Sequence, residues 1–520
     1  MFAAGNQFGL GPSARRDEKM AFPAELRYNP NVKMKFKGAV LAAAALAAAA
    51  ACDPQGSLTQ KRIRTVERGL SRTVYLQGLA PEKLKLEDRM NFYRVPGVSL
   101  AVIDGRSVAW ARAYGRKDAP SGQPMTTETL AQAGAFSQMI AAAVVFQLAE
   151  EGRLGLDDEV RRHLKSWSFP PEAGLDAPRL TIRRLLTHSA GLSDQPLPGY
   201  QRDDPIPTLS QMLDGEPPAR NGPLWIPPVR GSISRTRYAE AGFVILEQLL
   251  EDAAGKPFDV LARELVFEPL GLGGSLFEPG APGFLEGRAA AGHLREGRPV
   301  AGGWENYPNR AAAGLWTNPT DIAAFLVDLL RSAAEGKGVL LSTASARRLL
   351  SAQVESFGFG FLVEGPGDDI LFKLRGKTSG FSAYLALYPA KAQGAVLMAN
   401  SDNGHLLIEE MLCALSAAYD WPHFRPQEKQ VLRLDPETYA SFVGRYEVDP
   451  SYVLDVRWED YYLVIEPTGQ TATRFYAEGQ SLFYATDPYV RIQFLKDREG
   501  RVAGLRLWQQ DFELEAKKTS

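Results

Sequence analysis

Residues Ala133 to Met139 read AGAFSQM and lead into IAAAVVFQLAEEGRL, an apolar run long enough for a buried helix. A small residue just before a helix start is a position suited to a catalytic nucleophile, whose base would lie one helical turn further on. The chain has Ala135 there and Gln138 three residues later. A methyl group cannot attack a carbonyl, and a neutral amide cannot serve as a base near neutral pH. The stretch therefore has the spacing of a reactive pair but side chains that cannot react.

The chain offers no obvious serine nucleophile that could take the place of Ala135. Ser137 is the nearest hydroxyl, but two helical steps rotate it by about 200° from Ala135, so we expect it to make a helix-start or packing contact. No serine is followed three residues later by lysine, and no Gly-x-Ser-x-Gly element exists. His188 looks catalytic in isolation, but a hydrogen-bonded structural histidine is the commoner case. We therefore expect His188 to be structural.

Composition excludes several classes of function. The 520 residues exceed one ordinary domain, and a hydrophobic content of 45% is enough for a full core. Lys and Arg number 59 against 61 Asp and Glu, a formal charge of −2 that gives no reason to expect a nucleic-acid partner. The two cysteines, Cys52 and Cys413, cannot build a disulfide framework, and we expect Cys413 to be a buried packing residue. No zinc-ligand spacing is visible, so we expect neither a metal nor a cofactor.

The N-terminal region has the pattern of an export signal. Residues 34–52 read MKFKGAVLAAAALAAAAAC, with a basic start, an apolar stretch and small residues before a cysteine. The pattern resembles a bacterial lipoprotein signal, in which Cys52 would carry the lipid that attaches the chain to a membrane. A plain cleaved signal or an Ala-rich anchor are the alternatives, although the run is short for a spanning helix. We interpret residues 1–33 as an upstream extension ahead of the true start at Met34, and residues 53–79 as a linker.

The pattern of elements indicates two folded domains. Residues 96–115 predict two strands joined at Asp104-Gly105, and residues 386–404 predict a second pair. Helical patterns lie between them, including 180–186 and 242–254, which indicates an antiparallel sheet with helices packed on it. After a linker at 425–435, residues 436–520 alternate with period two, as in Leu454, Val456 and Trp458. This pattern predicts a small all-β, barrel-like domain with one buried face.

Several stretches of residues 80–424 together resemble the serine β-lactamase-like family, which comprises class C β-lactamases, D-alanyl-D-alanine carboxypeptidases and related esterases. They occur in family order: LAEEGRLGLDDEV (148–160), LLTHSAGL (185–192), RYAEAGFVILEQLLEDAAGKPF (237–258), FEPLGL (267–272) and GFSAYLALYP (380–389). The resemblance implies an α+β fold, with an antiparallel sheet flanked by helices and a helical subdomain. The C-terminal segment is similar to the small barrel often appended to these proteins.

The resemblance also implies the positions of the family's catalytic groups. Its Ser-x-x-Lys element falls on Ala135 and Gln138, and its Tyr-x-Asn element on Tyr238 and Glu240. KLRGKTSGF (373–381) occupies the third element, so Leu374 stands where His or Lys is expected and Gly376 is retained. Only Tyr238 keeps its family identity among the reactive positions. We therefore infer a catalytically degenerate member with no intact catalytic residue.

Three functions remain open for such a chain. A cleft lined by Phe136, Gln138, Tyr238, Glu240, Leu374 and Gly376 would bind a small-molecule or peptide-like ligand, or the fold would serve as a scaffold. Glu240 would disfavour the carboxylate-bearing compounds that the family accepts, because Lys373, Arg375 and Lys377 should face away from Leu374 on a regular strand. The alternative is a rewired hydrolase of esters, lactones or peptide-like amides that uses Tyr238 and Glu240. The oligomeric state does not follow from the sequence.

Overall fold

The computed structural model describes residues 54–170, 180–192, 195–225, 236–277, 282–509 and 512–519. The predicted signal of residues 34–52, Cys52 and the extension before it lie outside the described residues. Within the described ranges, no helix combines the length and the apolar character that crossing a membrane requires.

A six-stranded sheet forms the centre of the first folded region, with every neighbouring pair antiparallel. Its strand order is β3-β2-β9-β8-β7-β6, and the strands are β2 (Gly97–Asp104), β3 (Ser107–Gly115), β6 (Leu362–Glu364), β7 (Leu371–Thr378), β8 (Phe381–Tyr388) and β9 (Gln393–Ala399). Both predicted strand pairs are confirmed, β2 with β3 and β8 with β9. Two further pairs, β4 (Ala131–Gln132) with β5 (Trp316–Thr317) and β1 (Val74–Leu76) with β10 (Gln427–Lys429), were not expected.

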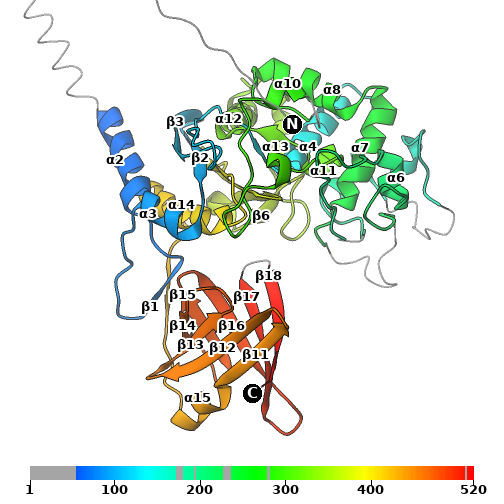
Figure 1. Ribbon diagram of the computed structural model, residues 1–520. Helices are drawn as coiled ribbons and strands as arrows, with labels where there is room; N and C mark the ends of the chain where they lie inside the picture. The colour runs from blue at the N-terminus through cyan, green and yellow to red at the C-terminus, as the bar shows by residue number, and fades with distance from the viewer. Residues whose placement is uncertain are drawn as a thin grey trace, which may run out of the picture. The chain divides into compact units, whose positions relative to one another are not determined.

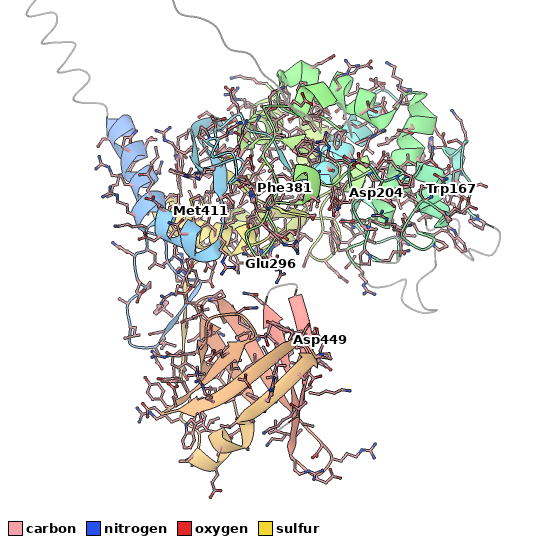
Figure 2. The ribbon with its side chains drawn as sticks, in the orientation of Figure 1. Trp167, Asp204, Glu296, Phe381, Met411 and Asp449 are labelled. Carbon is pink, nitrogen blue, oxygen red and sulfur yellow. The ribbon has the colours of Figure 1, made fainter. Side chains whose placement is uncertain are left out.

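Helices cover both faces of this sheet. Strand β8 is buried along its whole length, so it contributes side chains to two separate cores. Phe381 belongs to the core that contains α4, and Met411 to the core built around α14; both are labelled in Figure 2. A strand buried on both faces reads as a continuous apolar run, which explains why AYLALY shows no clean alternation.

The helices of this region follow in chain order, as labelled in Figure 1 where there is room. They are α2 (Pro54–Arg68), α3 (Leu86–Tyr93), α4 (Phe136–Glu150), α5 (Ile182–Leu186), α6 (Leu209–Asp214), α7 (Ala241–Ala254), α8 (Phe258–Ala262), α9 (Glu268–Leu270), α10 (Pro282–Leu285), α11 (Arg310–Ala313), α12 (Pro319–Glu335), α13 (Thr343–Leu349) and α14 (Gly404–Tyr419). The two helical patterns named above correspond to α5 and α7. Cys413 lies on α14 and is 3% exposed, which confirms its packing role.

The C-terminal region is a closed eight-stranded antiparallel barrel with its own core. Helix α15 (Pro436–Phe442) precedes β11 (Gly444–Asp449), β12 (Tyr452–Glu459), β13 (Tyr462–Pro467), β14 (Thr473–Ala477), β15 (Leu482–Thr486), β16 (Tyr489–Lys496), β17 (Val502–Gln509) and β18 (Phe512–Lys518). The predicted fold class, an α+β domain followed by an all-β barrel, is confirmed. Trp458 departs from the predicted buried face: it is 38% exposed and stacks on Tyr439, with ring centroids 5.9 Å apart.

Candidate functional site

The start of α4 is fixed by backbone contacts. Ala135 occupies the N-cap position without any side-chain cap, and Ser137 supplies the hydrogen bonds instead. The Ser137 hydroxyl donates to Gly134 O (2.7 Å) and accepts from Leu315 N–H (3.0 Å). The predicted helix-start role of Ser137 is therefore confirmed, and its hydroxyl is fully buried and occupied by these two bonds.

Gln138, one turn into α4, is the centre of a buried hydrogen-bond chain. Its Nε2 donates to Tyr238 Oη at 2.7 Å, and its Oε1 lies 3.2 Å from His188 Nε2. Because an amide oxygen only accepts, the histidine must carry its proton on Nε2. His188 Nδ1 then accepts from Ala239 N–H at 3.1 Å. At the other end, the Tyr238 hydroxyl is hydrogen-bonded to Glu240. Each group in the chain thus has a partner, and each bond has one direction.

Burial shifts the pKa of His188, Tyr238 and Glu240 toward the uncharged form of each group. It lowers the pKa of His188 to about 4, so the imidazole is neutral at pH 7. Burial, with the charge of Glu240, raises the pKa of Tyr238 far above its ordinary value. The phenol therefore stays protonated near neutral pH. Burial also raises the pKa of the Glu240 carboxyl to about 7, although the hydrogen bond from Tyr238 acts against it.

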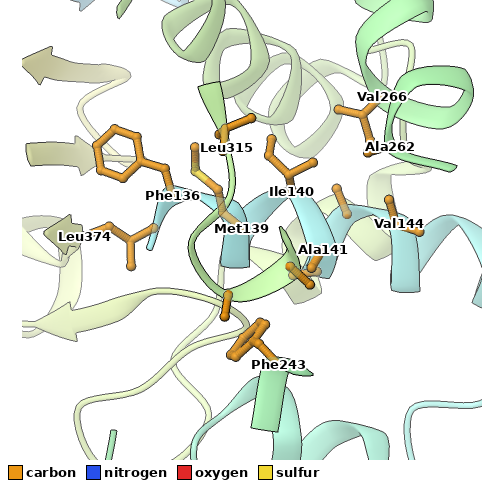
Figure 3. Close-up of a cluster of buried hydrophobic side chains, with 14 of the residues drawn as sticks. Phe136, Met139, Ile140, Ala141, Val144, Phe243, Ala262, Val266, Leu315 and Leu374 are labelled. Atoms are coloured by element: carbon orange, nitrogen blue, oxygen red, sulfur yellow. The ribbon is translucent and has the colours of Figure 1, made fainter. Parts of the chain in front are cut away.

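Phe136 and Leu374 lie on the apolar side of the site. Phe136 has no exposed surface and Leu374 is 2% exposed, and both belong to the core around α4. Figure 3 shows them in the buried cluster that also includes Met139 and Leu315. The side chain of Leu374 is thus part of the packed core. Among the six predicted cleft residues, Tyr238 and Glu240 keep partly exposed surface.

Strand β7 packs against the start of α4 through two glycines. A Cβ placed on Gly376 would lie 2.0 Å from Ala133 O, and one placed on Gly134 would lie 2.6 Å from Lys377 N. Gly134 also has a φ of +51°, which favours glycine. The two backbones therefore approach so closely that neither position has room for a side chain. This close approach fixes the distance between β7 and the start of α4.

The basic residues of β7 face away from Leu374, as predicted. Lys373 pairs with Glu364, and Arg375 lies 3.5 Å from Glu409 of α14. The alternation of buried and exposed residues along the strand places these cations opposite the α4 side. They cannot offset the charge of Glu240 within the site.

Two further residues take part in the site. His188 was expected to be structural, and the structure adds that it contacts Gln138 directly and packs against the Tyr238 ring at 4.6 Å. It has a φ of +50°, a conformation for which LLTHSAGL gives no local signal beyond the turn itself. Tyr307 accepts from Ser379 N–H at 3.0 Å and donates to Glu305 at 3.3 Å. No motif in the sequence pointed to Tyr307.

Among the residues that the structure describes, no group of three or more His, Cys, Asp or Glu side chains lies close enough to hold a metal ion. The reactive potential of the site rests on Tyr238, Glu240 and the amide of Gln138.

The chain is similar to a known protein family and to several of its members. Residues 84–411 match a family model described as Beta-lactamase. A putative D-alanyl-D-alanine carboxypeptidase from Escherichia coli O157:H7 is 26% identical over 325 residues, covering 55% of this chain and 74% of the relative. Penicillin-binding protein 4* from Bacillus subtilis (strain 168) is 21% identical over 424 residues, covering 76% of this chain and 89% of the relative.

A solved structure agrees with the fold. The octameric penicillin-binding protein homologue from Pyrococcus abyssi superposes with a TM-score of 0.55 at 20% identity, over 83% of this chain and 98% of that chain. The region matched by the family model contains Ala135, Gln138, Tyr238, Glu240 and Leu374.

Proposed function

The chain belongs to the beta-lactamase family, and from that premise we propose that it binds a ligand or acts as a scaffold without performing acyl transfer. The observation that carries the proposal is the hydrogen-bond chain through Gln138. It joins a neutral imidazole, an amide and a protonated phenol in the place where acyl transfer needs a nucleophile and a base.

The chemistry of this arrangement supports the proposal. Ala135 offers a methyl group, and the amide of Gln138 is occupied at both ends by His188 and Tyr238. In the serine protease subtilisin, removal of the nucleophile and its base lowers the rate by a factor of about 10⁶. Oxyanion and binding contributions alone leave about 10³ over water. Covalent turnover at this site is therefore not expected.

Intact-protein mass spectrometry tests the proposal. The chain from Cys52 to Ser520, with Cys52 replaced by serine, is exposed to a penicillin and to a fluorophosphonate probe. An Ala135→Ser/Gln138→Lys double variant is treated in parallel. We expect the native chain to stay unmodified and the double variant to gain the mass of a probe. A native chain that gains the mass of a probe at one residue would overturn the proposal and would identify the real nucleophile.

The charge of the site supports one class of ligand. Glu240 and Glu305 are both close to the Tyr238–Tyr307 region, since Glu240 acts on the pKa of each tyrosine and Glu305 accepts from Tyr307. We infer that neutral or cationic small molecules and peptides are preferred over carboxylates. Binding of matched amine and carboxylate peptides, measured by calorimetry, should favour the amine, and Glu240→Gln should reduce that preference. An unchanged preference in Glu240→Gln would rule Glu240 out as its cause.

The raised pKa of Glu240 favours one second candidate. A carboxyl group that titrates near pH 7 is suited to general-base catalysis, so Glu240 with Tyr238 could direct water at an ester or lactone. Turnover of a chromogenic ester should then rise as Glu240 loses its proton around pH 7 and should vanish in Glu240→Gln. Turnover that Glu240→Gln leaves unchanged would exclude this mechanism.

We propose in addition that the chain is exported and attached to the cell envelope through a lipid on Cys52. The pattern of residues 34–52 and the names of the relatives, a carboxypeptidase and penicillin-binding proteins, support this placement. Membrane fractionation should recover the chain in the membrane pellet, and Cys52→Ser should move it to the soluble fraction. A chain that stays in the pellet after Cys52→Ser would be attached by another means.

A further inference from the structure

A cavity lies on the opposite face of β7 from Leu374. It has a volume of about 160 Å³ and is lined by residues of β7, β8, α14 and the turn around Arg295, together with Gln509 at the end of β17. Side chains in its wall include Arg375 and Lys377 of β7 and His405 and Glu409 of α14. The family's catalytic positions contribute none of the lining side chains.

The strand pattern explains why positive charge collects there. On β7, Leu374 and Gly376 face α4, so Arg375 and Lys377 project to the other side. Arg295 approaches from a separate loop, closed by the bridge between His293 and Pro299. Three cations from two distant segments therefore share one wall, with Glu409 as the single carboxylate among the lining residues.

His405 of α14 lies beside these cations in the cavity wall. Its Nδ1 donates to Asp402 O at 2.7 Å, so Nε2 of the neutral imidazole is a hydrogen-bond acceptor. Burial lowers the pKa of His405 to about 4, and Lys377, Arg295 and Arg375 lower it further in that order. His405 also lies in the first turn of α14, where the helix dipole is positive. With three cations against one carboxylate among its lining residues, the cavity has an excess of positive charge.

We propose that this cavity binds a small organic oxyanion, a carboxylate or a phosphate that carries a short apolar group. Arg295 and Lys377 would hold the charged oxygens through charge-assisted hydrogen bonds, while Arg375 pairs with Glu409 in the same wall. Tyr384, Ala383 and Ile408 line the same cavity and provide the surface for the apolar group. The ligand class is opposite in charge to the one inferred for the Glu240 site, so the two sites would bind different molecules.

Calorimetry on the full chain with four probes tests the proposal. The probes are benzoate, phenyl phosphate, inorganic phosphate and neutral benzamide, which has the shape of benzoate without its charge. We expect benzoate or phenyl phosphate to bind with a Kd of about 1 mM or below, and benzamide not to bind. Preference between the two aromatic anions distinguishes a carboxylate site from a phosphate site. Inorganic phosphate binding as tightly as phenyl phosphate would overturn the role given to the apolar wall.

Variants assign the binding to the cavity. Lys377→Met and Arg295→Met should each weaken binding by about tenfold or more, because each removes a charge-assisted hydrogen bond. Lys373→Met is the matched control: it removes the same charge from the same face of β7, but Lys373 pairs with Glu364 and lies outside the lining. Its affinity should stay within about twofold of the unaltered chain.

Three results would overturn the proposal. They are no binding of any anion, equal binding of benzamide and benzoate, or equal weakening by Lys373→Met and Lys377→Met. None of these variants alters Ala135, Gln138, Tyr238 or Glu240. The outcome is therefore independent of whether the chain performs acyl transfer.

Discussion

At the scale of single residues, the site is defined by one amide. Gln138 is buried and bonded on both sides, so it holds His188 in one tautomer and Tyr238 in one orientation. A side chain that orders two neighbours in this way contributes to stability as well as to shape. Gln138 therefore both orders the site and stabilises the fold, and the stabilising contribution can be measured.

Replacing Gln138 with methionine should destabilise the chain by about 1–3 kcal/mol, because His188 Nε2 and the Tyr238 hydroxyl lose their buried partner. Urea unfolding measures the change. Gln77→Met, at an exposed position, is the control and should change stability by less than about 0.5 kcal/mol. Equal stability of Gln138→Met and the unaltered chain would show that the hydrogen-bond chain contributes nothing.

Residue types explain which parts of the site were predictable. The sequence contains Ala135 and Gln138 three residues apart, and the structure places them at the start of α4, as the helical pattern predicted. The contact of His188 with Gln138 depends on a turn fifty residues away, with a positive φ that no local pattern encodes. The burial of Phe136 and Leu374 was equally hidden, because it depends on how closely β7 approaches α4.

At the scale of elements, two junctions hold the region around the site. One is the contact of β7 with the start of α4 described above. The other joins α7 to α11: Glu247 of α7 is fully buried and accepts from Ala311 N–H at 2.8 Å, at the first turn of α11. Helix α11 also packs against α4, so the charge state of Glu247 bears on elements around the site.

The β7–α4 contact predicts the effect of one methyl group. Gly376→Ala would place a Cβ against the backbone of Ala133, which cannot move aside as a side chain can. We expect a loss of about 1–3 kcal/mol in the free energy of unfolding. Gly273→Ala is the control, since a Cβ there meets nothing within 4 Å. If both variants were equally stable in urea, the close approach of β7 to α4 would be disproved.

The α7–α11 junction predicts a pH dependence. Burial raises the pKa of the Glu247 carboxyl from an ordinary 4.5 to about 8. The folded chain therefore keeps a proton that the unfolded chain releases, so this contribution to stability is full below pH 4.5 and is lost as pH rises toward about 8. The slope is about 1.4 kcal/mol for each pH unit in that window.

Urea unfolding at about pH 5.5 and about pH 8 measures this slope. Glu247→Gln keeps an acceptor for Ala311 N–H and removes the titration, so the difference between the two pH values should shrink. Glu87→Gln, at an exposed position, should leave the difference unchanged. A difference that Glu247→Gln does not reduce would assign the pH dependence to other groups.

Element prediction succeeded where side chains alternate or run continuously apolar. The hairpins of β2 with β3 and β8 with β9 follow from turn residues between apolar runs, and the barrel strands follow from period-two patterns. The short strands β1, β4, β5 and β10 could not be found, since two or three residues carry no period. Trp458 was misplaced because its ring gains burial by stacking on Tyr439 rather than by facing the core.

At the scale of the whole molecule, the chain contains folded regions with separate cores. The barrel core, which includes Phe442, Tyr446, Phe483 and Phe494, shares no residue with the two cores beside the six-stranded sheet. Closure of the barrel leaves no open edge strand that requires a partner. Both properties are those of an independently folding domain.

Residues 430–520, produced alone, should therefore fold and unfold cooperatively. The fragment begins at Gln430 because its carbonyl accepts from the Tyr484 hydroxyl. Near-ultraviolet circular dichroism during urea unfolding should show one sigmoidal transition. A fragment without a cooperative transition would mean that the barrel depends on the rest of the chain.

The close approach of β7 to α4 has a thermodynamic consequence. Lys377 has its side chain in the wall of the cavity lined by Arg295 and Arg375, and its backbone lies against Gly134. Any displacement of β7 that accompanies occupancy on one face must alter the free energy of occupancy on the other. Linkage then requires reciprocity: whatever factor an anion applies to the affinity of the Glu240 face, a ligand of that face applies to the anion. Strand β7 would thus couple the two proposed binding sites energetically.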